Sequence, residues 1–298
     1  MIRLTCALAL SLSFILAPAS LAQEWGAQST SGIGDIRSTG GQSNFTFDSA
    51  GGAGIPIADT ELNDAVSTDF SGNGPWDRGL ARGFTGLTFA GNQPNPMRSE
   101  STLTGNLSQE FKFGSFPAGA VASNGVFVSD IFLYTGNQPG TITLNYSLEG
   151  TLVDSGGFSG IADPLTFIRA QVAVFADTPQ YRFLDDVPTL TLEEGATLKQ
   201  DSLGNDAYDQ DALFINNDTG GVKVTQTTSL TFDVVPGETF YVWQTLRTSA
   251  AFGTRSADAW GTLTGSFDQP GLVTSLSAPE PASAALLALG GLLSLRRR

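Results

Sequence analysis

The densest group of oxygen-bearing side chains in this sequence lies between residues 201 and 211, and its chemistry would be cation binding. Five of these positions are Asp or Asn: Asp201, Asn205, Asp206, Asp209 and Asp211. Calcium takes about six to eight such oxygens from flexible loops. The spacing is not that of an EF-hand, and a solvated acidic turn has the same composition. These five residues are therefore candidate Ca2+ ligands, although a plain solvated turn is the commoner structure for such a composition.

Aromatic side chains suggest a second kind of chemistry, the stacking of sugar rings. Tyr241 and Trp243 are two residues apart in an expected strand, so they share one face. Trp76 and Trp260 lie near Gly-rich turns. Flat rings exposed on a β-face can hold polysaccharide, whereas the same residues inside a sandwich fill the core. Tyr241 and Trp243 are therefore candidate sugar-stacking residues, although core packing is the commoner role of such residues in a sandwich.

Catalytic chemistry is limited by what the chain lacks. There is no histidine, which excludes Ser-His-Asp triads and histidine zinc sites. The single cysteine, Cys6, lies close to the N-terminus. Paired carboxylates suffice for a glycosidase. Glu110 and Glu149 are the candidates, because they lie on expected strands beside aromatic residues. A solvated charge on a strand face would give the same sequence pattern. We predict a protein that is not an enzyme; the alternative is a carbohydrate-active enzyme, a carboxylate-based glycoside hydrolase or lyase.

The N-terminal segment has the parts of an export signal. Arg3 supplies a positive start, residues 7–17 are apolar, and the small residues Ser20 and Ala22 follow. We expect a signal helix in residues 1–22, with cleavage after Ala22. The apolar stretch is too short for a spanning anchor. Cys6 precedes it instead of ending it, which argues against a lipoprotein.

The C-terminal segment, residues 279–298, also combines an apolar run with basic residues, but here the basic residues follow the apolar run. Pro279, Glu280 and Pro281 come first, an uncharged run over 282–295 follows, and the chain ends on Arg296, Arg297 and Arg298. As a helix the run would be ~21 Å long, against a hydrocarbon core of ~30 Å. The arginines favour a cytoplasmic terminus, which leaves the rest of the chain on the far side of the membrane.

These residues resemble the PEP-CTERM sorting signal: a Pro-Glu-Pro motif, a short Gly-containing hydrophobic helix and a basic end, in that order. The resemblance is confined to this tail. It implies transient membrane anchoring through the C-terminal helix and removal of the tail by an exosortase-type protease. It also implies a Gram-negative-type bacterium that makes exopolysaccharide or biofilm matrix, with the protein tethered to the inner membrane before it is secreted or displayed on the outer cell surface.

Without these two segments the body, residues 23–278, retains 11 basic and 28 acidic residues, a net charge of −17. Such a field repels nucleic acid and anionic lipid, so neither is an expected partner. The body has no cysteine, so burial and backbone hydrogen bonds must stabilise it. Exopolysaccharide is the partner that the resemblance of the tail implies.

Alternating and continuous apolar runs predict an all-β body. Residues 141–149 alternate as a half-buried strand does, and residues 126–134 form a longer run suited to a central strand. The segment Val235-Pro236-Gly237-Glu238 predicts a type II turn that connects two sheets. About ten strands indicate a single β-sandwich or jelly-roll-like domain, with a closed barrel as the alternative. Residues 23–54, rich in Gly, Ser and Thr, are expected to form a loose arm, and residues 72–82 a long loop.

Overall fold

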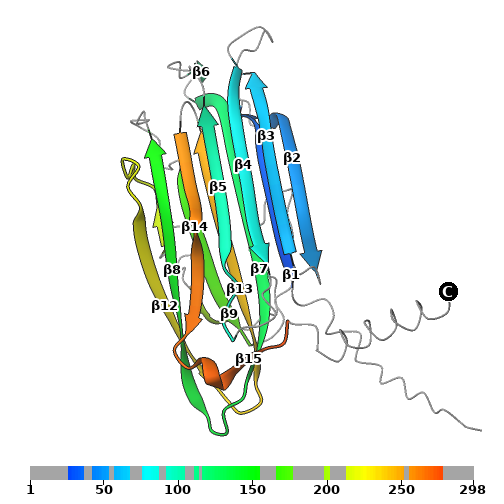
Figure 1. Ribbon diagram of the computed structural model, residues 1–298, viewed down its shortest axis with the longest axis vertical. Helices are drawn as coiled ribbons and strands as arrows, with labels where there is room; N and C mark the ends of the chain where they lie inside the picture. Colours follow the sequence, from blue (N-terminus) through cyan, green and yellow to red (C-terminus); the bar gives the residue numbers. More distant parts are fainter. Residues whose placement is uncertain are drawn as a thin grey trace, which may run out of the picture.

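The computed structural model describes residues 26–36, 42–53, 57–67, 76–86, 92–104, 111–113, 116–154, 166–176, 198–201, 213–251 and 255–277. These residues form two antiparallel β-sheets packed face to face, as Figure 1 shows. The expected signal and sorting helices lie outside the described residues. Within the described residues, no helix is long and apolar enough to cross a membrane.

The larger sheet has nine strands, six of them in the order β10-β9-β13-β7-β1-β2, with β6, β11 and β15 paired beside them. Their bounds are β1 Gly26–Ile36, β2 Gln42–Ala53, β6 Phe111–Phe113, β7 Phe116–Tyr134, β9 Phe167–Phe175, β10 Leu198–Asp201, β11 Leu213–Ile215, β13 Thr239–Ala251 and β15 Val273–Ser275.

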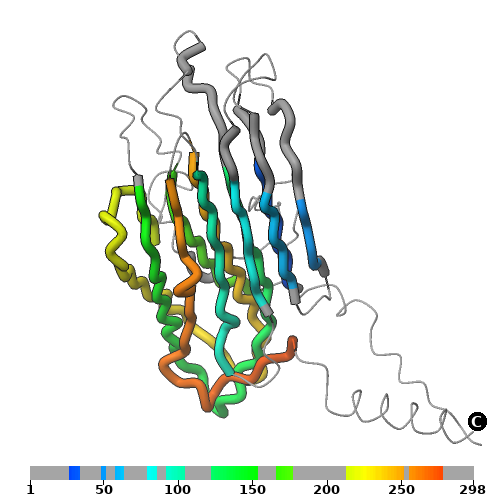
Figure 2. The backbone as a smooth tube through the Cα atoms, turned by 45° about the horizontal axis from the view of Figure 1, so that its top comes forward, coloured from blue at the N-terminus to red at the C-terminus, as the bar shows by residue number. Residues whose placement is uncertain are grey.

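The smaller sheet has six strands in the order β12-β8-β14-β5-β4-β3. Their bounds are β3 Ile57–Ser67, β4 Trp76–Gly86, β5 Met97–Thr104, β8 Gly140–Asp154, β12 Val224–Val234 and β14 Arg255–Phe267, and a 3-10 turn at Pro270–Leu272 leads from β14 into β15. Figure 2 shows this sheet as one layer of the body. The sandwich prediction is confirmed at the level of two separate antiparallel sheets.

Three expectations about individual strands are confirmed. β7 contains residues 126–134 and lies in the middle of the larger sheet, and β8 alternates between buried and exposed positions over residues 141–149. The turn after β12 joins the smaller sheet to β13 in the larger one. Gly237 takes φ 77° there, and Glu238 N donates to Val235 O at 3.0 Å, as a type II turn requires.

Two expectations about loops are wrong. The stretch 23–54 is not an arm, because residues 26–36 and 42–53 are β1 and β2, and β1 pairs with both β2 and β7. The expected loop over 72–82 contains the first part of β4, which pairs with β3 from residue 76 onward and with β5 from residue 78 onward. β1 looks polar because its inward Ser29 and Ser31 face a partly polar interior, and in β4 the absence of a side chain at Gly79 leaves room for Ile33.

That interior consists of two apolar clusters with a polar layer beside them. The larger cluster fills the space between β7, β9 and β13 on one side and β8, β12 and β14 on the other; its bulky members include Phe132, Ile142, Leu144, Tyr146, Leu148 and Phe240. The smaller cluster consists of Ile33, Ala81, Leu103, Ala122 and Ala250. Burying such side chains contributes roughly 1.5–3 kcal/mol each for the larger ones.

The polar layer is centred on Asn124 of β7. Its Oδ1 accepts from Ser99 Oγ at 2.7 Å, and its Nδ2 donates to Ser31 Oγ at 3.0 Å. Ser29 and Ser31 of β1 also hydrogen-bond Thr60 Oγ1 of β3, at 2.6 and 2.9 Å. All five side chains are buried. The hydrogen bonds satisfy groups that would otherwise be costly to bury, so strands poor in large apolar residues still pack.

Candidate functional site

An ion pair fixes one end of a candidate site on the outer face of the smaller sheet. Arg82 of β4 lies directly opposite Glu100 of β5. Arg82 Nε donates to Glu100 Oε2 at 2.7 Å, and Nη2 lies 2.6 Å from the same oxygen. The Arg82 side chain is 34% exposed and that of Glu100 15%. Contact through two nitrogens holds the guanidinium in one orientation, as short charge-assisted bonds do.

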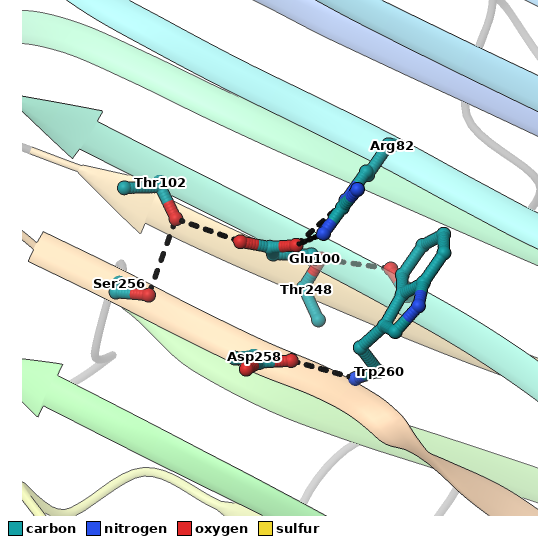
Figure 3. Close-up of polar contacts among 8 residues, drawn as sticks. Arg82, Glu100, Thr102, Thr248, Ser256, Asp258 and Trp260 are labelled. Atoms are coloured by element: carbon teal, nitrogen blue, oxygen red, sulfur yellow. Dashed lines mark hydrogen bonds and ion pairs between the residues drawn. The ribbon is translucent and has the colours of Figure 1, made fainter. Parts of the chain in front are cut away.

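Trp260 of β14 stacks against this pair. The Arg82 guanidinium carbon lies 4.2 Å from the centroid of the indole ring, a cation-π contact, and Trp260 is half-buried. Figure 3 shows the ring beside the Arg82–Glu100 pair, with three neighbouring strands supplying the group. Because Glu100 fixes the Arg82 guanidinium, Arg82 in turn holds the Trp260 ring in one position.

A β-bulge in β14 determines the direction of the Trp260 side chain. The pairing of β14 with β8 shifts between Asp258 and Thr262, so extra residues of β14 face one stretch of its neighbour. Asp258 Oδ1 accepts from Trp260 N at 2.7 Å inside the bulge. Thr262 takes φ 116°, which is unfavourable for a β-branched residue. Bulges and strained residues of this kind often re-aim side chains at functional sites.

Short polar side chains complete the surface. Thr102 Oγ1 donates to Glu100 Oε1 at 3.4 Å and lies 3.2 Å from Ser256 Oγ. Asp258 lies directly opposite Glu100 across the β14–β5 pair. The face therefore offers one flat ring with a cation, two carboxylates and two hydroxyls around it (Figure 3). This arrangement can bind a ligand that has both an apolar face and a rim of hydroxyl groups.

The residues predicted as the platform lie elsewhere and are buried. Tyr241 and Trp243 do share a face of β13, but their exposed fractions are 7% and 1%. They pack in a third apolar cluster, on the opposite side of the larger sheet from the sandwich interior, with Phe127, Ile131, Ala173 and Phe175. The burial favours core packing, the alternative to a platform, at these two positions.

The other predicted residues are only partly described. Asp201 ends β10, whereas Asn205, Asp206, Asp209 and Asp211 lie outside the described residues, as do Glu110 and the sorting motif at 279–281 and 296–298. The calcium site therefore stays a prediction. Among the described residues there is no group of three or more acidic, histidine or cysteine side chains that would hold a metal. Glu149 lies on the outer face of β8 in an ion pair with Lys223.

A buried carboxylate lies in the sandwich interior, apart from this face. Asp130 of β7 is fully buried, and Asn95 Nδ2 donates to its two carboxylate oxygens at 3.0 and 2.8 Å. Burial raises the pKa of Asp130 from 3.8 to about 6, against the lowering effect of hydrogen bonds from Asn95 and Ser277. Burial and the charge of Asp130 raise the pKa of Tyr146 well above 10. Burial therefore links the protonation of Asp130 to the stability of the folded protein.

The sequence pointed to Trp260 but not to its partners Arg82 and Glu100. A tryptophan next to a glycine is visible in the sequence, whereas Arg82 and Glu100 are 18 residues apart and meet only through the register of β4 and β5. The bulge that turns Trp260 toward them carries a threonine where a glycine would be the usual signal. No local pattern would have revealed the group.

Comparison with known proteins leaves the chain without an assigned family. No family model and no curated protein matches it. Among solved structures, one described as concerning the "carbohydrate-binding modules from the beta-sandwich super family" is similar at 11% identity and a TM-score of 0.19, over 77% of this chain and 83% of that one. A likeness this slight carries no inference about function. The fold and the outer face define the class, an antiparallel β-sandwich with an aromatic and polar sheet face.

Proposed function

We propose that this protein is an exported, non-enzymatic cell-surface or matrix protein that binds exopolysaccharide through the outer face of its smaller sheet. The observation that carries the proposal is the half-buried Trp260 ring, held 4.2 Å from Arg82 on an open sheet face. A pyranose has an apolar face that suits an aromatic ring and a rim of hydroxyls that suits Arg82, Glu100 and Asp258. Because the ring is fixed before a ligand arrives, little conformational entropy remains to be lost on binding.

Export and sorting form the second part of the proposal, and the terminal segments support it. The signal segment 1–22 and the PEP-CTERM-like tail 279–298 both suit a protein held at the inner membrane until an exosortase removes the tail. The body's first and last described residues lie at neighbouring positions along β7: Gly26 pairs with Ser129, and Ile131 N donates to Ser277 Oγ at 2.9 Å. The described body therefore begins and ends at neighbouring positions of β7, and a tether at either end would hold that side of the body toward the membrane.

A catalytic role is the second candidate, because Asp258 and Glu100 face one another beside Trp260. Residues directly opposite on neighbouring strands have Cβ atoms about 4.5–5.5 Å apart, and glycosidases also use two neighbouring carboxyl groups, about 5–9.5 Å apart. Both carboxylates are, however, already engaged, Glu100 by Arg82 and Asp258 by the Trp260 backbone. This engagement favours binding without turnover.

One experiment separates the two candidates. The purified protein is run in affinity electrophoresis through gels that contain soluble neutral and acidic polysaccharides, and the same mixtures are assayed for reducing ends. We expect retardation without release of reducing ends. Trp260→Ala should weaken binding roughly 30-fold, since losing a central aromatic contact costs about 2 kcal/mol. Phe214→Ala, which removes a half-buried ring on the other sheet, is the matched control.

The outcomes that contradict the proposal are distinct. If Trp260→Ala is retarded as strongly as the unaltered protein, the Trp260 ring does not take part in binding. Release of reducing ends that disappears in Glu100→Gln or Asp258→Asn would establish the enzyme instead. Mass spectrometry of the native protein tests the sorting claim separately: an intact residue 1 and residue 298 on the secreted molecule would contradict it.

A further inference from the structure

β12, Val224–Val234, forms one edge of the smaller sheet, and Figure 1 shows it at the left side of the body. It pairs with β8 along all eleven of its residues without a register shift. Among the described residues, no strand pairs with its other side. An edge strand directs half of its backbone N–H and C=O groups away from its neighbour, so this side of β12 can hydrogen-bond a further strand.

β12 lacks the features that normally keep an edge strand from pairing with another chain. Natural edge strands are short, or contain proline, lysine, inward charges or bulges. The eleven residues of β12 include no proline, glycine or lysine, and its one charged side chain, Asp233, is exposed. β3, the edge strand at the opposite end of this sheet, instead carries Asp59 and Glu61 and packs against β1 and β2. Of these two edges, β12 is the one suited to pairing.

Pairing of β12 with β12 of a second copy has a register that joins opposite charges. Antiparallel pairing must keep the outward residues of one copy beside those of the other, so each two-fold axis passes beside a residue of β12. With the axis at Thr228, Lys223 of each copy lies opposite Asp233 of the other. The Lys223 side chain is 55% exposed, and Asp233 is exposed as well. This register therefore forms two ion pairs, one at each end of the joined strands.

The contacts that these two side chains already make are compatible with the ion pairs between copies. Lys223 forms an ion pair with Glu149, and Asp233 Oδ1 accepts from Thr141 Oγ1 at 3.0 Å. A lysine ammonium has three donors and a carboxylate has about four acceptor positions, so each group can take part in more than one such contact. Pairing with a second copy therefore does not require either contact to break.

The two most exposed large apolar side chains among the described residues flank the same strand. Val222 and Val235 are 65% and 53% exposed, and they lie at opposite ends of β12. A single exposed apolar side chain is ordinary on a protein surface. The register with its axis at Thr228, however, brings Val222 of each copy next to Val235 of the other. The charges and the exposed valines therefore favour the same pairing, which removes apolar surface from water at both ends of the strand.

β12 is held in position before a second copy arrives. Gln226 Nε2 donates to Phe214 O of β11 at 2.8 Å, which fastens this strand to the larger sheet. A fixed strand loses little conformational entropy on pairing. We propose that two copies of this protein associate through β12, antiparallel about Thr228, and join their smaller sheets into one. The association does not depend on a ligand, but it would place two Trp260 rings on one side of the joined sheet, where both can engage one polysaccharide chain.

Sedimentation equilibrium of the purified protein tests the association. At about 0.15 M salt the Debye length is about 8 Å, which screens the repulsion between the two acidic bodies. We expect a reversible dimer with a dissociation constant of roughly 1–100 μM. Asp233→Lys and Lys223→Asp each place like charges opposite one another and should weaken the dimer at least about tenfold, whereas the double variant should restore it. Asp59→Lys, which makes the same change of charge on the edge strand β3, is the matched control and should leave the dissociation constant unchanged.

A cysteine at the two-fold axis tests the register. Thr228 lies opposite its own counterpart, with Cα atoms about 4.5–5.5 Å apart, a separation that suits a disulfide. Thr228→Cys should therefore form a disulfide between copies under mild oxidation. Thr225→Cys, on the same strand but about 20 Å from its counterpart in this register, should not. The native Cys6 is common to both variants, so it does not affect the comparison.

Three results would contradict the proposal. The first is a protein that stays monomeric at about 200 μM. The second is a dimer that both charge variants leave intact, or in which Thr225→Cys cross-links as readily as Thr228→Cys, because the contact then lies elsewhere. The third is cross-linking of Thr228→Cys in the producing cells to a chain of different mass without a homodimer, which assigns the edge to another partner. None of these measurements uses a polysaccharide, so their failure and the failure of the proposed function are distinguishable.

Discussion

Replacing Asp130 by Asn should change how the stability of this protein depends on pH. Asp130 is fully buried, and its pKa is raised from 3.8 to about 6, chiefly by burial. The other titratable side chain near it among the described residues is Tyr146, whose pKa is raised well above 10 and which therefore stays neutral below that pH. Between pH 3 and pH 8 the local change in protonation belongs to Asp130 alone.

The sign follows from which state holds the proton more tightly. Between about pH 4 and pH 6 the folded protein keeps the Asp130 proton while the unfolded chain has lost it, so the folded state binds more protons. Stability is thus fully present below pH 3.8 and falls as the pH rises toward the folded pKa. The shift of about two units corresponds to roughly 3 kcal/mol of lost stability by pH 8. An amide at this position has no proton to lose and removes the dependence.

Chemical denaturation at a series of pH values gives the free energy of unfolding of Asp130→Asn and of the unaltered protein. The difference between the two cancels the contributions of the other titrating groups. Asp130→Asn should gain about 3 kcal/mol relative to the unaltered protein between pH 3 and pH 8. Asp218→Asn, an exposed carboxylate that accepts from Gly220 N at 2.8 Å, makes the same change of charge at the surface and serves as control. A difference that stays constant with pH, or that grows as the pH falls, would refute the reasoning.

Three further substitutions test the interior and the bulge by the same denaturation measurement. Asn124→Ala should destabilise by about 3 kcal/mol, because it removes the side-chain hydrogen bonds to Ser99 Oγ, Ser31 Oγ and Thr30 O, each of which contributes about 1 kcal/mol; a loss below 1 kcal/mol would mean that the polar layer rearranges freely. Gly83→Ala should cost about 1–3 kcal/mol, because the added Cβ would overlap the Asn124 amide and lie 2.6 Å from Ser29 Oγ. Thr262→Gly should stabilise by about 1 kcal/mol as relief of the φ 116° conformation exceeds the entropy cost of glycine; destabilisation would show that the residue is not strained.

The strands that pack the large apolar cluster could be predicted from sequence, because each carries its own signal. Residues 141–149 alternate by residue type, and in the structure Ile142, Leu144 and Leu148 are buried while Thr141 and Asn145 are exposed. The turn at 235–238 was predictable for the same reason: the proline and glycine impose their own dihedral angles, whatever the rest of the fold does. Local chemistry and tertiary structure agree in this half of the body.

The candidate site was not predictable, because it exists only through register. Arg82 lies in a Gly-rich stretch that reads as a loop, and its partner Glu100 lies on the next strand. Tyr241 and Trp243 show the opposite failure: the sequence places them on one face correctly but cannot say which face is covered. Residue spacing fixes which side chains share a strand face, and only the assembled sheets decide whether that face is open to a ligand.

The polar layer explains why the Gly-, Ser- and Thr-rich N-terminal strands fold at all. A strand normally joins a sandwich by burying apolar side chains, and β1 offers few of them. Its inward Ser29 and Ser31 instead meet Thr60 and Asn124, so their hydroxyls exchange water for fixed protein partners. Such bonds tolerate misalignment less than apolar contacts do, which pins the register of β1 against β7. Loss of the layer should therefore loosen β1 and β3 before the apolar cluster at the other end, and amide hydrogen exchange in Asn124→Ala would show faster exchange in those strands while β8 and β12 keep their protection. Uniformly faster exchange across both halves would instead show that the sandwich unfolds as one unit.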